Sequence, residues 1–407
     1  MASSLSSSFK LPVSTNSRPC YINTLPPELL REVFILSLPT KREWTDTSLL
    51  SISPLSLVQV CKSWRLFVEG VPELWQTLYI HRDNIASDCL ENVGPGAGRF
   101  LSHALQRSIS LSIDLPSYGL ITSDVLSHIP WASLVELEII EGKFSVDMAL
   151  EILACCGNLV QCTFFMLGSP CVSELVLDGP VIVLNHLEYL SVTFGSAWFP
   201  VYSASSGAET SKKISPLFEH LELPALEYLK IRASMASIDI DLPLALLECQ
   251  RDSQFPLKTL EFSNVLCNTQ HLRDLLSELP TLTTLHLLHT DKRCCHQYPH
   301  LLDLLSFTNG IDETGEPIKN ILPNLERLKV QDTIRCTELF TDQWDHRVLD
   351  AIESRTWTAG AYPYREVGLA QLKKVTIRWD GRRHSPPIAN RLNNLRRAGL
   401  IMHHTVI

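Results

Sequence analysis

Hydrophobic residues recur in one short pattern from Ser108 to the end of the chain. Ile109, Leu111 and Ile113 alternate with serines, which is typical of a half-buried strand. Later copies follow the pattern Leu-x-x-Leu-x-Ile/Val/Leu, as in Leu226–Ile231 and Leu325–Val330. The pattern predicts strands over residues 108–113, 134–140, 159–165, 187–194, 226–231, 257–262, 282–288, 325–330 and 372–379.

Segments with helical spacing of apolar residues separate several of these strands. Helices are predicted over residues 148–156, 270–279, 300–307, 346–354 and 389–398. The predicted fold class is therefore α/β, with neighbouring strands in a parallel sheet. The repetition resembles leucine-rich repeats, which implies a curved solenoid with outer helices. Strand starts lie roughly 25 to 47 residues apart, against about 20–29 in the standard repeat, so the copies would be degenerate. An ordinary α/β domain with leucine-rich strands is the alternative.

The segment from Tyr21 to Ile80 has a different pattern, which predicts three short helices. Two prolines suit the first turn of the first helix, where a missing N–H costs nothing. Its apolar positions are Leu30, Val33, Phe34 and Leu38. The second helix is predicted to present one continuous apolar face: Leu57, Val60, Cys61, Trp64 and Val68. The third is a single apolar turn that ends with Leu74 and Trp75.

Three motifs in this segment follow a known order. Leu-Pro-x-Glu-Leu begins at Leu25, Val-Cys-x-x-Trp at Val60 and Pro-x-Leu-Trp at Pro72. Together they resemble the F-box, in the form found in mushroom-forming fungi, whose variable insert would correspond to residues 40–53. The residues that carry the F-box pattern are Leu25, Pro26, Glu28, Leu29, Val33, Phe34, Leu57, Val60, Cys61, Trp64, Leu74 and Trp75. A plain three-helix cap on a larger domain is the alternative.

The resemblance implies a substrate receptor of an SCF-type (Skp–cullin–F-box) ubiquitin ligase, not an enzyme. Residues 21–80 would dock on a Skp-type adaptor and, through it, on a cullin, with the Leu25-Pro26 start and Val33/Phe34 as the expected contacts. Residues 108–407 would hold an unidentified target protein. Two other functions stay open: an F-box scaffold outside any ligase, and a repeat-based interaction protein that binds no adaptor.

Composition and charge narrow the class of protein. The chain has 407 residues, 45% of them hydrophobic and 19% charged, which is typical of a folded domain. A formal net charge of −9 argues against nucleic-acid binding. The 12 cysteines have no framework spacing, which favours reduced thiols and a cytoplasmic or nuclear location. No apolar run is long enough for a membrane helix. Residues 1–20 are expected to be a disordered tail rather than a transit segment, and residues 81–107 a linker and a helix.

Catalytic, metal and cofactor motifs are weak or missing. The loop Gly94–Gly98 is glycine-rich, but it contains proline and lacks the Lys-Ser/Thr of phosphate-binding loops, so a hinge is favoured. The densest Cys/His cluster surrounds Cys294, Cys295 and His296, with spacing unlike that of zinc ligands. We therefore expect no metal, no cofactor and no catalytic residues.

Strand alternation also predicts a target-binding face. If the leucines of each copy face the core, the residues between them face outward. The candidate target-binding residues are Tyr189, Tyr228, Lys230, Arg232, His286, Arg327, Lys329 and Arg378. Their mixture of aromatic and basic side chains predicts a preference for an acidic segment. Ordinary solvated positions are the alternative, and the loops 196–216 and 308–323 are the alternative target sites. The basic stretch 365–407 is predicted to be either a solvated rim or a patch for an acidic partner.

Overall fold

The computed structural model describes residues 22, 25–38, 54–80, 110–114, 131–140, 145–166, 180–195, 214–239, 241–289, 305–306, 321–332, 341–356, 370–379 and 386–406. The chain divides into two compact units between Leu74 and Trp75. The predicted tail 1–20 and the predicted linker 81–107 lie outside the described residues. The predicted module boundary at Ile80 lies too late, because Thr77–Ile80 form strand β1, which pairs with the next strand of the second unit.

The first unit is helical. It contains helices α1 (Pro27–Leu36), α2 (Leu55–Val60) and α3 (Lys62–Gly70), and the 3-10 turn η4 (Pro72–Trp75) follows at the boundary. Proline at the first position of α1 requires no hydrogen-bond partner, as the sequence predicts. After the last turn, the hydroxyl of Ser37 donates to the carbonyl oxygen of Phe34 at 2.7 Å.

The predicted second helix is two helices, because Cys61 interrupts it. Cys61 has an extended backbone, with φ −160° and ψ 169°, and its thiol sulfur accepts a hydrogen bond from the N–H of Trp64 at 3.4 Å. This contact caps the start of α3. The apolar spacing across α2 and α3 therefore does not form one continuous helical face, and this prediction is wrong.

Aromatic side chains form the core of the first unit. The ring of Phe34 is 1% exposed and lies 4.7 Å from the ring of Trp64 and 5.7 Å from that of Phe67. An ion pair of 2.8 Å between Arg31 and Glu73 ties α1 to η4. These contacts fix which face of α1 points inward.

The second unit is built on an 11-stranded sheet in which every neighbouring pair is parallel. Its order is β1-β2-β3-β4-β6-β8-β9-β10-β11-β12-β13, so neighbours in space follow each other along the chain. After β1, the strands are β2 (Ser110–Asp114), β3 (Glu136–Ile140), β4 (Gln161–Met166), β6 (Tyr189–Phe194), β8 (Tyr228–Ile238), β9 (Thr259–Leu266), β10 (Thr284–His289), β11 (Arg327–Asp332), β12 (Lys374–Trp379) and β13 (Ile401–Val406). The predicted strands are all present, and β1 and β13 are additional.

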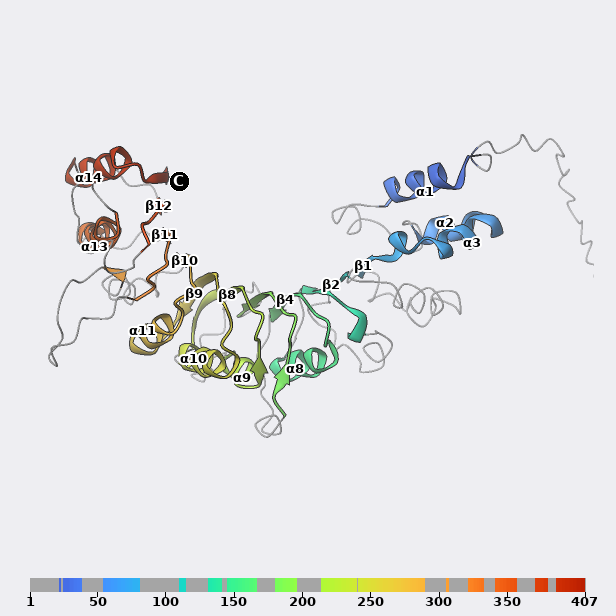
Figure 1. Ribbon diagram of the computed structural model, residues 1–407, viewed down its shortest axis with the longest axis horizontal. Helices are drawn as coiled ribbons and strands as arrows, with labels where there is room; N and C mark the ends of the chain where they lie inside the picture. Colours follow the sequence, from blue (N-terminus) through green and yellow to red (C-terminus); the bar gives the residue numbers. More distant parts are fainter. Residues whose placement is uncertain are drawn as a thin grey trace, which may run out of the picture. The chain divides into compact units, whose positions relative to one another are not determined.

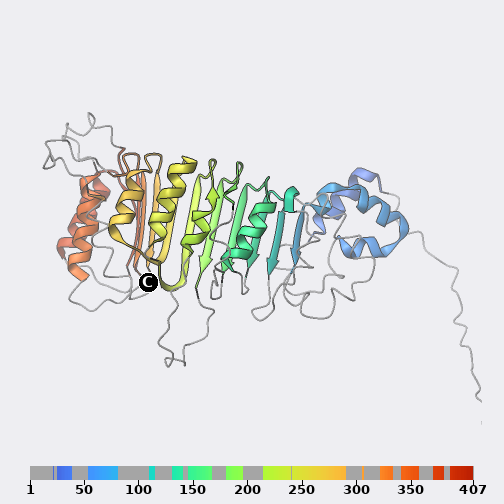
Figure 2. The ribbon, with the colours of Figure 1, turned by 90° about the horizontal axis from the view of Figure 1, so that it is seen from below.

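Helices cover one face of this sheet (Figures 1 and 2). They are η5 (Trp131–Ser133), α8 (Val146–Cys155), α9 (Ser215–Glu219), α10 (Leu242–Ser253), α11 (Thr269–Ser277), α13 (Thr341–Ser354) and α14 (Pro386–Arg397). The prediction of an α/β fold with a parallel sheet is confirmed. Of the predicted helix 300–307 the structure describes only Leu305 and Ser306. A separate two-stranded sheet joins β5 (Ile182–Val183) to β7 (Leu221–Glu222).

One turn recurs before the strands and explains the leucine pattern. The N–H of the first leucine of a copy donates to the carbonyl oxygen three residues earlier, from Leu226 to Leu223, for example, at 3.1 Å. The same bond recurs at Leu282 and at Leu325, each at 3.2 Å. These leading leucines are all fully buried. The copies that begin at Leu226, Leu282 and Leu325 therefore share the same turn and the same buried first position.

A buried arginine supports the turn that leads into β11. Arg355, at the end of α13, is 4% exposed. Its guanidinium donates to the carbonyl oxygens of Leu305 at 2.6 Å, of Leu322 at 2.8 Å and of Ile321. Burial lowers the pKa of Arg355 to about 10. These hydrogen bonds hold Ile321 and Leu322, which precede β11, next to the end of α13.

Candidate functional site

An apolar stripe lies exposed on α1. Leu29, Val33 and Leu36 follow the spacing i, i+4 and i+7, so they lie on one face of the helix. Their exposed fractions are 53%, 41% and 83%. Leu30 and Phe34 lie on the neighbouring face and are buried. The helix thus has two apolar faces, of which only one contributes to the core.

The residues of the F-box pattern separate into three groups. The exposed group is Pro26, Glu28, Leu29, Val33 and Val60. The half-buried group is Leu25, Leu57, Cys61 and Trp64. The buried group is Phe34, Leu74 and Trp75. The prediction that Phe34 is a contact residue is wrong, because its ring fills the core between α1 and α3.

Six of the eight predicted target-binding residues lie in two rows of the sheet register. One row joins neighbouring strands through Gln161, Tyr189, Tyr228, Thr259, Thr284, Arg327 and Lys374. The next row contains Glu138, Thr163, Ser191, Lys230, Glu261, His286, Lys329 and Thr376. The alternating positions, such as Leu328 and Val330, are buried. We call the face formed by these two rows the open face, because the helices lie on the other side of the sheet (Figure 1).

Glu261 on β9 is the centre of a polar network on the open face. Its carboxylate lies 3.0 Å from the ammonium of Lys230 and 3.3 Å from Nδ1 of His286. It also accepts a hydrogen bond of 3.2 Å from the hydroxyl of Tyr228, whose ring stacks on that of Tyr189 at 4.6 Å. Four neighbouring strands are joined in this way.

The charge of Glu261 is stabilised by its neighbours. Burial opposes ionisation of this side chain, but hydrogen bonds from His286 and Lys230 outweigh burial and lower the pKa of Glu261 to about 2. Burial, followed by the nearby Glu261 charge, raises the pKa of Tyr228. The network therefore contains an ionised carboxylate beside a neutral phenol at neutral pH.

Glu261 also adds a carboxylate to the face, for which the sequence predicted a mixture of aromatic and basic side chains. Lys230 and His286 are among the predicted binding residues, and both are directed to this carboxylate. The residues that β9 contributes to the face were not among the candidates. The alternation Thr259-Leu260-Glu261-Phe262-Ser263 carries the signal that identifies them.

A second group of cations on the open face has no such partner. Arg327 on β11 lies in register with Lys374 on β12, and Lys329 follows two residues later on β11. Arg327 and Lys374 are exposed and Lys329 is half-buried. Among the described residues, none of the three forms an ion pair. We call Arg327, Lys329 and Lys374 the β11–β12 cluster. Arg232 on β8 is exposed, and the side chain of Arg378 lies outside the described part of the chain.

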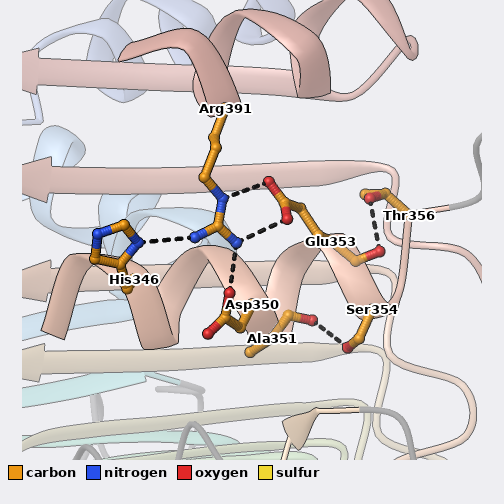
Figure 3. A network of polar contacts seen from close by, with 7 residues as sticks. All are labelled: His346, Asp350, Ala351, Glu353, Ser354, Thr356 and Arg391. Carbon is orange, nitrogen blue, oxygen red and sulfur yellow. Dashed lines mark hydrogen bonds and ion pairs between the residues drawn. The ribbon is translucent and has the colours of Figure 1, made fainter. Parts of the chain in front are cut away.

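On the helical side, Arg391 joins α14 to α13 (Figure 3). Its Nε and Nη2 donate to the two carboxylate oxygens of Glu353 at 2.8 and 2.7 Å. Nη2 also lies 2.5 Å from a carboxylate oxygen of Asp350, and Nη1 lies 3.0 Å from Nδ1 of His346. The hydrogen bond with Glu353, more than any other contact, raises the pKa of Arg391. Two residues of the basic C-terminal stretch thus form ion pairs within the fold. They are Arg391 and Lys373, and Lys373 pairs with Glu326 at 2.5 Å.

The weaker candidate sites lie outside the described residues. These are the loop Gly94–Gly98, the cluster around Cys294, Cys295 and His296, and most of the loops 196–216 and 308–323. Within the described ranges, no group of His, Cys, Asp and Glu side chains could hold a metal ion. The helices of the described part are all too short or too polar to cross a bilayer.

Comparison with known proteins gives no assignment. No protein-family model matches the chain, and no curated protein is significantly similar to it. Two surfaces of the molecule therefore bear on its function: the exposed residues Leu29, Val33 and Leu36, which we call the α1 stripe, and the open face.

Proposed function

We propose that this chain is the substrate-recognition subunit of an SCF-type ubiquitin ligase. The first unit would be an F-box that docks on a Skp-type adaptor, and the second a degenerate leucine-rich-repeat solenoid that holds a target protein. The observation that carries the proposal is the α1 stripe: Leu29, Val33 and Leu36 are exposed on the helix that opens with the F-box motif. An exposed apolar patch on a small unit marks an interaction surface.

The two faces of α1 suit this role. Leu30 and Phe34 pack inside the first unit, so their neighbours on the stripe are held on a rigid helix. A rigid apolar surface loses little conformational entropy when it binds. Pro26 and Val60 are also exposed and belong to the F-box pattern. The proposed adaptor surface therefore consists of the stripe and these two residues.

The second unit supports the target-binding half of the proposal. Its strands follow one another in sequence order, with a recurring turn before the strands and helices on one side. Such stacking is typical of repeat solenoids, which bind partners on extended surfaces. The open face offers charged and aromatic side chains from neighbouring strands. The chain would then act by raising the local concentration of a target near the transfer machinery, with no bond chemistry of its own.

Adaptor binding by matched variants tests the proposal. The full chain with Leu29→Asp and Val33→Asp is expected to bind a purified Skp-type adaptor at least about 100-fold more weakly, because the contact would bury unpaired charge. The control carries Leu244→Asp and Ile401→Asp, two exposed apolar positions of the second unit with the same added charge. The control should bind like the parent chain.

Three outcomes separate the candidate functions. Equal adaptor affinity of the Leu29/Val33 variant and the control, with both folded, would reject the α1 stripe as the docking surface. No adaptor binding by the parent chain would favour the repeat protein without an adaptor. Adaptor binding without cullin-dependent ubiquitin transfer to any captured protein would favour the scaffold outside a ligase.

A further inference from the structure

Charge is unevenly distributed along the open face. Strands β10 to β12 contribute six register positions to the two rows of this face, and none of them is acidic: Thr284, His286, Arg327, Lys329, Lys374 and Thr376. At the other end, β3 contributes Glu136 and Glu138 to the same two rows. A chain with a net charge of −9 therefore gathers positive charge at one end of this face.

Within these two rows, the described cations without an ion pair lie on β11 and β12. In the middle of the face, Glu261 neutralises Lys230 and contacts His286. At the turn before β12, Lys373 is paired with Glu326. The β11–β12 cluster has no such acidic neighbour among the described residues.

The arrangement inside the cluster is electrostatically unfavourable without a ligand. Arg327 and Lys374 are direct register partners on adjacent strands. Like charges at such positions repel each other, and the fold places no described carboxylate between them. An anion bound over the two strands would relieve this repulsion.

We propose that the β11–β12 cluster binds an acidic peptide segment of the target protein. The inference rests on the proposed role of the second unit in target binding and specifies the class of target. Arginine and lysine side chains are suited to hold carboxylates through charge-assisted hydrogen bonds. The acidic residues of the segment lie at β11–β12, because Glu136 and Glu138 repel them at the β3 end.

The dimensions of the sheet set the length of such a segment. The strands β3, β4, β6, β8, β9, β10 and β11 are successive neighbours. With about 4.8 Å between neighbouring strands, the two charged ends lie about 29 Å apart along the sheet. An extended segment of about nine residues covers this distance. Its central residues then meet the stacked rings of Tyr189 and Tyr228.

Peptide is favoured over nucleic acid as the ligand. Binding of single strands uses aromatic side chains interleaved with basic ones, and the six register positions of β10 to β12 in these rows contain no Phe, Tyr or Trp. A nucleic acid that followed the open face would also meet Glu136 and Glu138 at the opposite end. A peptide can vary its charge along its length, and a phosphate backbone cannot.

Selection from a peptide library tests the inference. The full chain is presented with a randomised display library of peptides about ten residues long. Selected peptides are expected to be several-fold enriched in Asp and Glu. The variant with Arg327→Glu, Lys329→Glu and Lys374→Glu should lose this enrichment and select Lys and Arg instead. The control reverses three exposed arginines of the helical side, Arg273, Arg396 and Arg397, to Glu and should still select acidic peptides.

The outcomes either support or overturn the proposal. Peptides without acidic enrichment, or with equal enrichment for the β11–β12 variant, would overturn it. Tighter binding of an oligothymidylate of similar length than of a selected peptide would assign the cluster to nucleic acid. The selection uses no adaptor, so a failure of adaptor docking and a failure of this inference give different results.

Discussion

The α1 stripe and the β11–β12 cluster are two exposed surfaces of one chain with opposite chemistry. The stripe consists of three exposed apolar side chains on one helix, whose neighbouring face packs into an aromatic core through Phe34. The cluster consists of three cations on two strands, with no described counterion. Among the described residues, no apolar side chain buries the first surface and no carboxylate pairs with the second.

This difference predicts different binding behaviour. Apolar contact depends on buried area and hardly on salt, whereas contacts between exposed charges are screened over about 8 Å at physiological ionic strength. Adaptor docking should therefore survive moderate salt, and target capture should weaken.

The largest expected effect is the loss of stability on replacing Phe34, the buried neighbour of the stripe. Phe34→Ala removes a ring that is 1% exposed and should destabilise the first unit by about 3–5 kcal/mol. Leu29→Ala, on the exposed face, should change stability by less than about 0.5 kcal/mol. Hydrogen exchange of α1 in the full chain, measured for both variants, checks the contrast. Equal protection in the two variants would contradict the assignment of inner and outer faces.

The contribution of the Glu261 network to the free energy of unfolding should depend on pH. The folded pKa of Glu261, about 2, lies below the unfolded value of about 4.3, so its stabilisation is complete above pH 4.3 and disappears as pH falls through 2. Glu261→Gln should therefore cost about 1–3 kcal/mol at pH 7 and much less near pH 2. Denaturant unfolding of the parent chain and of the Glu261→Gln variant at several pH values measures this cost.

Glu227→Gln is the control for the Glu261 experiment. Glu227 pairs with Lys258 at 2.5 Å, but both side chains are exposed, so its loss should cost less than about 1 kcal/mol. A cost for Glu261→Gln that stays constant from pH 7 to pH 2 would show that the ion pairs do not stabilise the sheet.

Strand positions could be predicted from the sequence because each copy repeats its buried leucines. The spacing Leu-x-x-Leu-x-Ile/Val marks both a strand and the turn before it, as at Leu226 and Leu325. β13 was not predicted, because its sequence, Ile401–Val406, lacks the leucines of the repeated pattern. Helix α10 carries a signal that was missed: Leu242, Ala245, Leu246 and Cys249 follow helical spacing, and its proline lies within the first turn.

The candidate surfaces were harder to predict, since they depend on contacts between distant segments. Val33 and Phe34 are adjacent and apolar, and only the packing of α3 against α1 decides which one is buried. The interruption at Cys61 depends on one backbone conformation, which apolar spacing does not reveal. The neutralisation of Lys230 depends on a residue 31 positions away on the next strand, and strand register provides it.

Arg391 forms ion pairs, whereas Arg327 in the β11–β12 cluster has none among the described residues. Arg391→Lys keeps the charge but loses the two-oxygen contact with Glu353, so we expect a loss of about 1 kcal/mol. Thermal unfolding in low and moderate salt measures the loss. Arg396→Lys, at an exposed position of the same helix, should have almost no effect, and an equal effect of both changes would contradict the role of the network.

The smallest expected effect is a gain of stability rather than a loss, and it tests the β11–β12 cluster directly. Lys374→Thr removes one of two like charges in direct register, so it should stabilise the isolated chain by about 0.2–1 kcal/mol. Lys373→Thr is the control, because Lys373 is paired with Glu326 and its loss should be neutral or slightly destabilising. Denaturant midpoints in low salt compare the two variants. The gain at Lys374 should shrink as salt is added, because repulsion between exposed charges is screened. A destabilised Lys374→Thr variant would mean that the ammonium has a favourable partner, and the repulsion between Arg327 and Lys374 would no longer support an anion at this site.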